Sequence, residues 1–185
     1  MILRYAITDP AYYTSDPAEL RRRVRTMLAQ HGAHMVCLRD KECHDYHLLA
    51  EAFLSLKPEF PGTKFLLHTD FALAERLEAD GVHLPSGRID DVTEVKKRGL
   101  WCIVSTHTPE EITLCEKKGA DAVTYSPIFA TPGKGEPKGL EKLKEIKDKI
   151  SLKLFALGGI VSIEQVKAVE RAGADGFASI RYFVE

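Results

Sequence analysis

The sequence predicts a (β/α)8 barrel, the TIM-barrel fold, as a single domain over residues 1–185. A short Gly-Ala-Asp pattern or a close variant occurs four times, at 32–36, 78–82, 119–123 and 173–177. The copies are roughly 40–55 residues apart, which is about two βα units. Each copy follows an amphipathic helical stretch and begins a short apolar run. The copies therefore mark every second strand of a chain of βα units that closes into a parallel barrel.

Eight apolar runs, most of them separated by helical periodicity, are the predicted strands. They cover residues 3–7, 33–38, 64–67, 81–84, 101–104, 122–125, 153–157 and 176–180. Capping residues indicate where helices begin, and glycines indicate where they end. The predicted starts are Asp16-Pro17, Thr108-Pro109 with Glu111, and Ser162 with Gln165; the predicted ends are Gly32, Gly119 and Gly173. Because such barrels carry their chemistry at the carboxyl ends of the strands, the residues after each run are the candidate site.

Two segments depart from the regular alternation of strands and helices. Residues 130–139 are rich in Pro, Gly and Lys and separate the sixth strand from a helix predicted at 140–150, so we expect a lid over the catalytic end. The sequence stops soon after the eighth run, which predicts a short barrel whose final helix is missing or truncated. Part of the barrel wall would then be covered by residues 182–184 or by a second subunit, so we expect a homo-oligomer.

Composition excludes several classes of function. The formal net charge is −1 and no basic tract is present, which argues against nucleic acid as a partner. No apolar run is long enough to cross a membrane, and the first residues read as a strand rather than a signal peptide. The four cysteines show no C-x-x-C pairing, so we interpret them as reduced thiols of a cytoplasmic protein without a zinc site.

The ends of the seventh and eighth strands favour a phosphate site. Gly158 and Gly159 follow the seventh strand and Arg181 follows the eighth. In (β/α)8 barrels these loops often bind phosphate through backbone N–H groups and a helix N-terminus, and glycine lets the backbone approach the anion. Arg181 would add a charged hydrogen bond. The alternative is a tight turn beside a solvated arginine.

Charged and titratable side chains follow several other strands. Arg39 and Lys41 follow the second strand on one side of the chain and are candidates to hold an anion, unless Arg39 merely pairs with Asp40 on the surface. The fifth strand ends near Ser105 and His107, and His107 is a candidate acid or base or else a helix-capping residue. The remaining histidines at strand ends are His68 and His83; His44 and His47 are expected on a solvated helical face.

The ordered set of these motifs resembles the thiamin phosphate synthase/TenI superfamily over nearly the whole chain. The motifs are Leu38-Arg39-x-Lys41, Asp80-Gly81-Val82-His83, Ser105-x-His107, Ser126-Pro127-Ile128-Phe129-x-Thr131-x-x-Lys134, Gly158-Gly159-Ile160 and Gly173-Ala174-Asp175-Gly176. The resemblance implies a (β/α)8 barrel. Synthases of this superfamily join a pyrimidine pyrophosphate to a thiazole phosphate with magnesium, and the TenI branch includes tautomerases that isomerise a carboxythiazole phosphate.

The resemblance also implies roles for individual residues. In a synthase, Arg39 and Lys41 would meet the pyrophosphate, and Thr131 and Lys134 would close over it. Ser105 would lie near the pyrimidine. The thiazole phosphate would be held by Gly158 and Gly159.

Departures from the synthase pattern indicate the TenI-like branch. His68-Thr69 replaces the Asn-Asp pair expected after the third strand, and Pro85-Ser86-Gly87-Arg88 replaces the acidic motif expected after the fourth. Both carboxylates expected to hold magnesium are therefore missing, so we predict no metal or other cofactor; magnesium would be needed only in a synthase.

The predicted function follows from these departures. We expect the protein to bind a thiazole phosphate or thiamin phosphate and to isomerise or salvage the thiazole. Because Pro127 stands where a tautomerase carries its catalytic histidine, the base would be His107, His68 or His83, and we favour His107. The alternatives are a thiamin phosphate synthase and a non-catalytic ligand-binding or regulatory homologue.

Overall fold

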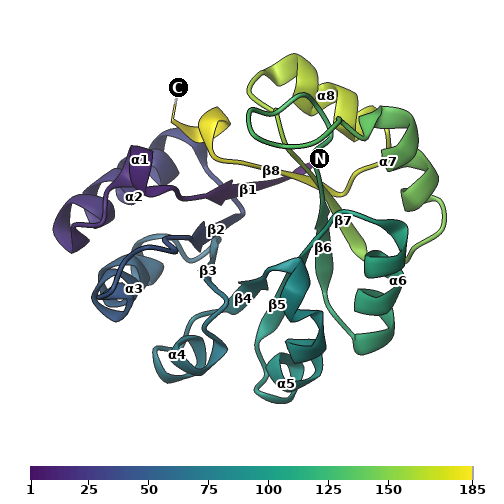
Figure 1. The fold of residues 1–185 in the computed structure, drawn as a ribbon. Helices are drawn as coiled ribbons and strands as arrows, with labels where there is room; N and C mark the ends of the chain where they lie inside the picture. Colours follow the sequence, from purple (N-terminus) through teal and green to yellow (C-terminus); the bar gives the residue numbers. More distant parts are fainter. Residues whose placement is uncertain (185) are drawn as a thin grey trace.

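Eight parallel strands form a closed barrel in the computed structural model, which describes residues 1–184 (Figure 1). Every strand pairs with its neighbours in sequence, and β8 pairs with β1 to close the ring. The strands are β1 Leu3–Ile7, β2 Met35–Leu38, β3 Lys64–His68, β4 Gly81–Leu84, β5 Trp101–Thr106, β6 Ala122–Tyr125, β7 Lys153–Leu157 and β8 Gly176–Ser179. The predicted fold and all eight predicted strands are confirmed.

The helices form an outer ring around the barrel (Figure 1). They are α1 Pro10–Tyr13, α2 Pro17–His31, α3 Tyr46–Leu54, α4 Phe71–Arg76, α5 Val92–Lys97, α6 Pro109–Lys118, α7 Gly139–Lys147 and α8 Ile163–Arg171, with 3-10 turns η1 Lys57–Glu59, η2 Ser86–Asp91 and η3 Arg181–Phe183. The predicted caps are present: Asp16 accepts from the amide of Glu19, and Ser162 and Gln165 form a reciprocal capping box. Helix α7 ends at Lys147, three residues before the predicted end.

Side chains alternate between the inside of the barrel and the helix layer. The inner cluster contains Tyr5, Ile7, Met35, Cys37, Leu66, Ile103, Ala122, Phe155 and Ala178. Phe155 occupies space that Gly176 leaves open, because a Cβ on Gly176 would lie 2.3 Å from the Phe155 ring. The barrel is therefore a packed core rather than a channel. Within residues 1–184, no helix has both the length and the apolar character needed to span a membrane.

Up to residue 184, only the turn η3 follows β8. The Phe183 ring is buried and stacks on Phe177 at 5.8 Å, while Tyr182 packs edge-on against both rings. The turn that carries them lies between α8 and α2 (Figure 1). Coverage by a second subunit stays a prediction.

The repeated Gly-Ala-Asp pattern builds one recurring contact at the amino end of the barrel. Asp80, Asp121 and Asp175 each accept a hydrogen bond, at 2.7–2.8 Å, from the amide of the second residue in the preceding odd-numbered strand. Each also pairs with a lysine from the layer outside the barrel: Lys57 with Asp80, Lys96 with Asp121, and Lys147 with Asp175. In the first copy, His34 Nδ1 accepts the equivalent amide, that of Arg4.

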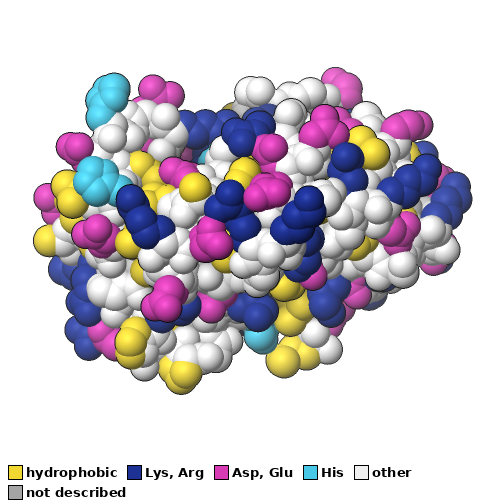
Figure 2. All heavy atoms as spheres, turned by 90° about the horizontal axis from the view of Figure 1, so that it is seen from below, with side chains coloured by type: hydrophobic (Ala, Val, Ile, Leu, Met, Phe, Trp, Pro, Cys, Tyr) yellow, Lys and Arg dark blue, Asp and Glu magenta, His cyan; other side chains and the backbone are white. Residues whose placement is uncertain are grey.

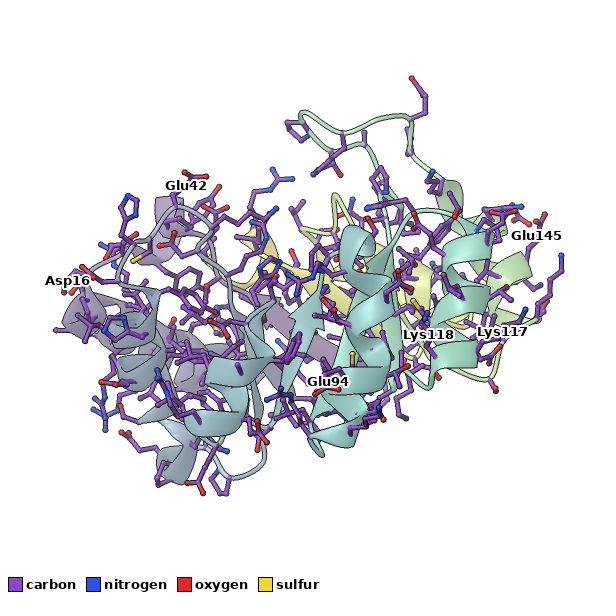
Figure 3. The ribbon with its side chains drawn as sticks, turned by 60° about the horizontal axis from the view of Figure 1, so that its bottom comes forward. Asp16, Glu42, Glu94, Lys117, Lys118 and Glu145 are labelled. Atoms are coloured by element: carbon purple, nitrogen blue, oxygen red, sulfur yellow. The ribbon has the colours of Figure 1, made fainter. Side chains whose placement is uncertain are left out.

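The surface carries charges of both signs. Figure 2 shows basic and acidic side chains interleaved over one face, without a continuous basic patch on that face. The long loop after β6 stands above the barrel on the side where Glu42 lies (Figure 3). Its base is anchored by hydrogen bonds from the amides of Lys138 and Gly139 to the carbonyls of Pro127 and Ile128.

Candidate active site at the carboxyl end of the barrel

A cavity of about 350 Å³ lies between the ends of β7 and β8. Four residues predicted to bind the ligand line it together: Thr131, Gly158, Gly159 and Arg181. Tyr12, on the short helix α1, also lines it and was not predicted. The structure therefore brings a cation and a glycine-rich turn to one cavity.

Close packing favours glycine at both positions, in addition to the expected approach of an anion to the backbone. Gly158 and Gly159 have φ values of +104° and +68°, and a Cβ on Gly159 would lie 2.6 Å from the carbonyl oxygen of Ala130. Within residues 1–184, neither glycine amide donates to a protein acceptor. The amides of Val161 and Ser162, at the start of α8, both donate to Gln165 Oε1. The glycine amides, rather than those two capping amides, are therefore the free donors.

Arg39 and Lys41 lie at another part of the mouth, after β2. The alternative pairing of Arg39 with Asp40 is absent from residues 1–184, because Asp40 is buried and accepts from the Ser15 hydroxyl at 2.5 Å and from two local amides. The pKa of His68 is lowered to about 4. Burial is the largest cause, and the positive charges of Arg39 and Lys41 lower it further. His68 is therefore neutral at physiological pH.

His107 lies at the mouth with its ring against β6. Its Nδ1 is 3.1 Å from the carbonyl oxygen of Ser126 and 3.3 Å from the Ser126 hydroxyl. A carbonyl oxygen only accepts, so this contact assigns the proton of the neutral ring to Nδ1 and leaves Nε2 as a proton acceptor. The backbone amide of His107, not its ring, takes part in helix capping by donating to Glu111 at 2.7 Å.

His83 lies inside the barrel rather than at its rim. It is 3% exposed, its Nδ1 is 2.7 Å from the Tyr5 hydroxyl, and its Nε2 is 2.8 Å from Ser105 Oγ. Burial, with smaller contributions from His68 and Arg39, lowers the pKa of His83 to about 3. Both ring nitrogens are occupied, which favours a positioning role for His83 over direct proton transfer. Tyr5 was missed from the sequence, although the alternation of β1 places it inward.

Lys134 lies apart from the cavity that Thr131 lines. It is exposed on the long loop, and its amide donates to the carbonyl of Thr131 at 3.2 Å. The structure thus places the loop beside the cavity between β7 and β8 but does not bring Lys134 together with Arg39 and Lys41.

The carboxylates near the mouth do not fit a magnesium site. Asp9 and Asp70 cap α1 and α4 by accepting local amides, and Asp40 is held by Ser15. Arg88, in the position where the family pattern is acidic, pairs with Asp91. In the described part of the chain, no three metal-ligating side chains gather.

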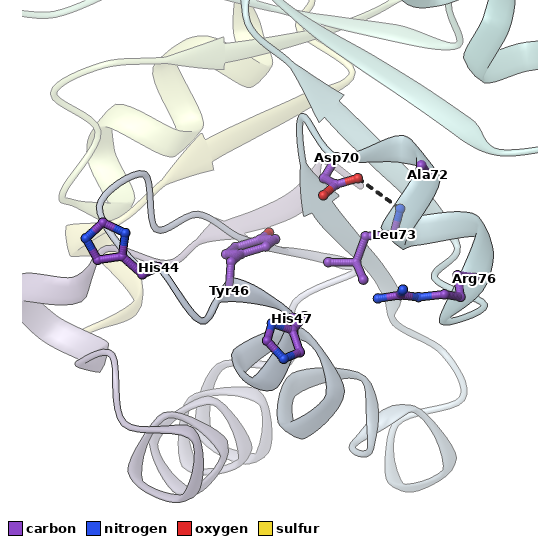
Figure 4. A pocket seen from close by; sticks show the side chains of 7 residues that line it. All are labelled: His44, Tyr46, His47, Asp70, Ala72, Leu73 and Arg76. Atoms are coloured by element: carbon purple, nitrogen blue, oxygen red, sulfur yellow. Dashed lines mark hydrogen bonds between the residues drawn. The ribbon is translucent and has the colours of Figure 1, made fainter.

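A cavity of about 630 Å³ lies beside α3 and α4, and Asp70 is among the side chains that line it (Figure 4). Asp70 Oδ1 accepts the amide of Leu73 there. His44 and His47 line the same cavity with Arg76, but His44 precedes α3, so the expected shared helical face is wrong. Both histidines are exposed, as expected.

The matching family and two relatives with similar sequences share one activity in their names. The family described as thiamine monophosphate synthase matches residues 4–183. A protein named "Putative thiamine-phosphate synthase 2" from Aquifex aeolicus is 36% identical, over 98% of this chain and 97% of that protein. A thiamine-phosphate synthase from Methanocella arvoryzae is 32% identical, over 80% of this chain and 73% of that protein.

A solved structure gives the same result. The thiamine phosphate pyrophosphorylase from Pyrococcus furiosus superposes with a TM-score of 0.82 at 27% identity, covering 97% of this chain and 85% of that one. The barrel, the ordered motifs and these relatives agree, and the chain belongs to the thiamine monophosphate synthase/TenI family.

Proposed function

We propose that this protein binds a phosphorylated thiazole, either thiazole phosphate or thiamin phosphate, at the carboxyl end of the barrel. The observation that carries this proposal is the cavity between β7 and β8, which is lined by Arg181 and by Gly158 and Gly159, whose amides have no acceptor within residues 1–184. Charged hydrogen bonds and backbone N–H groups are the ordinary means of holding a phosphate. The heterocycle would extend from there over the barrel mouth.

The reaction is isomerisation of the thiazole by proton transfer, with His107 as the base. The support is the contact of His107 Nδ1 with the Ser126 carbonyl, which leaves Nε2 free to take a proton. His68 is a weaker candidate, because a group whose pKa is lowered to about 4 has little affinity for a proton. The step needs no metal, in keeping with the missing carboxylate donors.

Thiamin phosphate synthesis is the second candidate, and the names of the relatives favour it. In that reaction a pyrophosphate leaves, and its charge must be neutralised. Arg39 and Lys41 are the cations that follow β2 at the mouth, and Lys134 would have to reach the same group from the long loop. Arg88 is not available, since it pairs with Asp91. Removing one preorganised electrostatic contact commonly costs about 3–4 kcal/mol of transition-state stabilisation, so loss of the metal ligands predicts slow synthesis.

The deciding experiment measures thiamin phosphate formation from pyrimidine pyrophosphate and thiazole phosphate, with and without magnesium. Calorimetry on the same preparation measures binding of thiazole phosphate and thiamin phosphate. We expect binding without robust synthesis. Magnesium-dependent product would establish the second candidate instead, and failure of both ligands to bind would overturn the proposal.

A His107→Ala variant separates the isomerase from a non-catalytic binding protein. If His107 is the base, turnover of a carboxythiazole phosphate falls about 10²–10⁴-fold while ligand affinity changes little. His47→Ala, on the outer cavity, is the matched control and should leave turnover unchanged. Binding with no turnover in the unaltered protein would support the non-catalytic alternative.

A further inference from the structure

A buried chain of hydrogen bonds crosses the inside of the barrel. It runs from the Tyr5 hydroxyl on β1 to His83 on β4, and from His83 to the Ser105 hydroxyl on β5. The Tyr5 ring lies between two others, stacking on His83 at 5.7 Å and meeting Phe155 edge-on at 5.9 Å. Tyr5 is fully buried, His83 is nearly so, and Ser105 is the one member that is partly exposed. The chain therefore leads from the core to the mouth.

The protonation of this chain is constrained. Burial raises the pKa of Tyr5 well above its usual value and lowers that of His83, so both groups are neutral. A neutral imidazole donates from one nitrogen and accepts at the other. When the Tyr5 hydroxyl donates to Nδ1, Nε2–H donates to Ser105 Oγ, and the Ser105 proton is directed elsewhere. In that arrangement, the tautomer of the ring links the direction of the Tyr5 proton to the way Ser105 presents its hydroxyl.

A second hydroxyl lies beside Ser105 without a partner. Thr124 is paired with Ser105 in the β5–β6 register, so both side chains project into the barrel. Thr124 Oγ1 is buried and has no hydrogen-bond partner among the described residues. A buried hydroxyl without a partner is costly, and such groups in native proteins call for an explanation. Thr124 is fully buried and Ser105 is partly exposed, so a polar ligand atom would have to pass Ser105 to supply that partner.

We infer that Tyr5 and His83 are positioning residues, which orient the Ser105 hydroxyl so that it and Thr124 bind a polar ring atom of the ligand. This inference rests on the proposed function, because the ligand is the phosphorylated heterocycle held at the β7–β8 cavity. Neither Tyr5 nor His83 touches the ligand. Each acts through the next member of the chain, and the binding free energies of Tyr5 and Ser105 variants must therefore be coupled.

A double-mutant cycle tests the coupling, with thiamin phosphate as the calorimetric probe. Ser105→Ala is expected to weaken binding about tenfold and Tyr5→Phe about three- to tenfold, since each removes one hydroxyl. The double variant should bind within about twofold of Ser105→Ala, because the phenol has no further effect once Ser105 is gone. Thermal unfolding confirms that each variant is folded.

Two substitutions of His83 test whether an amide group can replace the imidazole ring in positioning Ser105. His83→Gln places an amide N–H near the position of Nε2 and should keep affinity within about threefold of the unaltered protein. His83→Asn, whose amide replaces Nδ1, keeps only the contact to Tyr5 and should lose as much affinity as Ser105→Ala. Thr124→Val removes the unpartnered hydroxyl, so it should weaken binding about threefold while leaving the melting temperature unchanged or higher.

The outcomes separate the inference from the proposed function. If the unaltered protein binds thiamin phosphate but the effects of Tyr5→Phe and Ser105→Ala simply multiply, or Tyr5→Phe has none, the positioning role is overturned and the proposed function stands. If His83→Gln and His83→Asn weaken binding equally, the role is likewise overturned. If neither thiamin phosphate nor thiazole phosphate binds, the proposed function fails and this inference fails with it.

Discussion

The two ends of the barrel are built on opposite principles. At the amino end, Asp80, Asp121 and Asp175 make the same contact to a strand amide and to a lysine outside the barrel. At the carboxyl end, the chemistry varies from strand to strand: cations follow β2 and β8, histidines end β3 and follow β5, and glycines follow β7. The comparison indicates that the repeated end maintains the fold, while the varied end carries the function.

One copy at the amino end differs from the others. Lys57, Lys96 and Lys147 come from the segments that precede β3, β5 and β7. His34 occupies that copy and accepts the Arg4 amide through Nδ1, so the backbone hydrogen bond is kept without a lysine partner.

The largest effect should come from Gly159, where a substitution should lower both the free energy of unfolding and the affinity for phosphate. Gly159→Ala introduces a Cβ 2.6 Å from a backbone oxygen at a φ of +68°, so the free energy of unfolding should fall by about 2–4 kcal/mol and phosphate binding should be lost. Chemical denaturation and calorimetry measure the two effects. Gly133→Ala is the control: its φ is +73° with nothing within 4 Å, so it should cost about 1 kcal/mol. Equal losses in both variants would contradict the packing explanation.

At the amino end, Asp121→Ala should lower the free energy of unfolding by roughly 1.5–3 kcal/mol, because the Cys102 amide and Lys96 lose a charged partner. Ligand affinity should stay within about twofold, measured by the same calorimetry. Asp90→Ala breaks only a surface pair with Lys118, in which Asp90 is 93% exposed, and should cost less than about 0.5 kcal/mol. A change in ligand affinity in Asp121→Ala would contradict the assignment of stability to the amino end of the barrel and of ligand binding to the carboxyl end.

Acid should destabilise the folded protein, because His68 at the carboxyl end of the barrel is neutral in the fold. The folded-state pKa of His68 is lowered to about 4 from 6.5, so the unfolded chain binds more protons between these values and stability falls as pH falls through that window. From pH 7 to pH 5, His68 should account for about 2 kcal/mol of lost stability. His68→Gln should remove that part of the pH dependence, measured by urea unfolding at each pH. An unchanged pH dependence would mean that His68 is as readily protonated in the fold as in the unfolded chain.

The smallest change in free energy should come from Arg181→Ala, which should affect ligand binding and not folding stability. Arg181→Ala removes a cation from the β7–β8 cavity and should weaken thiamin phosphate binding at least tenfold, about 1.4 kcal/mol, with little change in melting temperature. Arg171→Ala, an exposed position at the end of α8, is the matched control and should bind normally. Unchanged affinity in Arg181→Ala would mean that Arg181 is a solvated side chain that does not bind the phosphate.

Much of the fold follows from local sequence. Alternation and apolar runs located all eight strands, and the Asp16 cap, the Ser162–Gln165 box and Gly119 mark helix ends where the structure has them. These signals act within a few residues of one another, so neighbouring side chains and backbone geometry are enough to specify them. The glycines after β7 and the arginine after β8 were assigned to one site because barrel topology brings adjacent strand ends together.

Tertiary structure decided which side chains meet. Tyr5 and His83 are 78 positions apart, and His83 and Ser105 are 22 apart, yet closure of the barrel places all three on one hydrogen-bonded line. Sequence alone identified His83 as a titratable residue at a strand end. It did not show that both ring nitrogens are occupied. The physical reason is that strand register and helix packing, rather than local propensity, determine the partners of a side chain, and with them its protonation and its role.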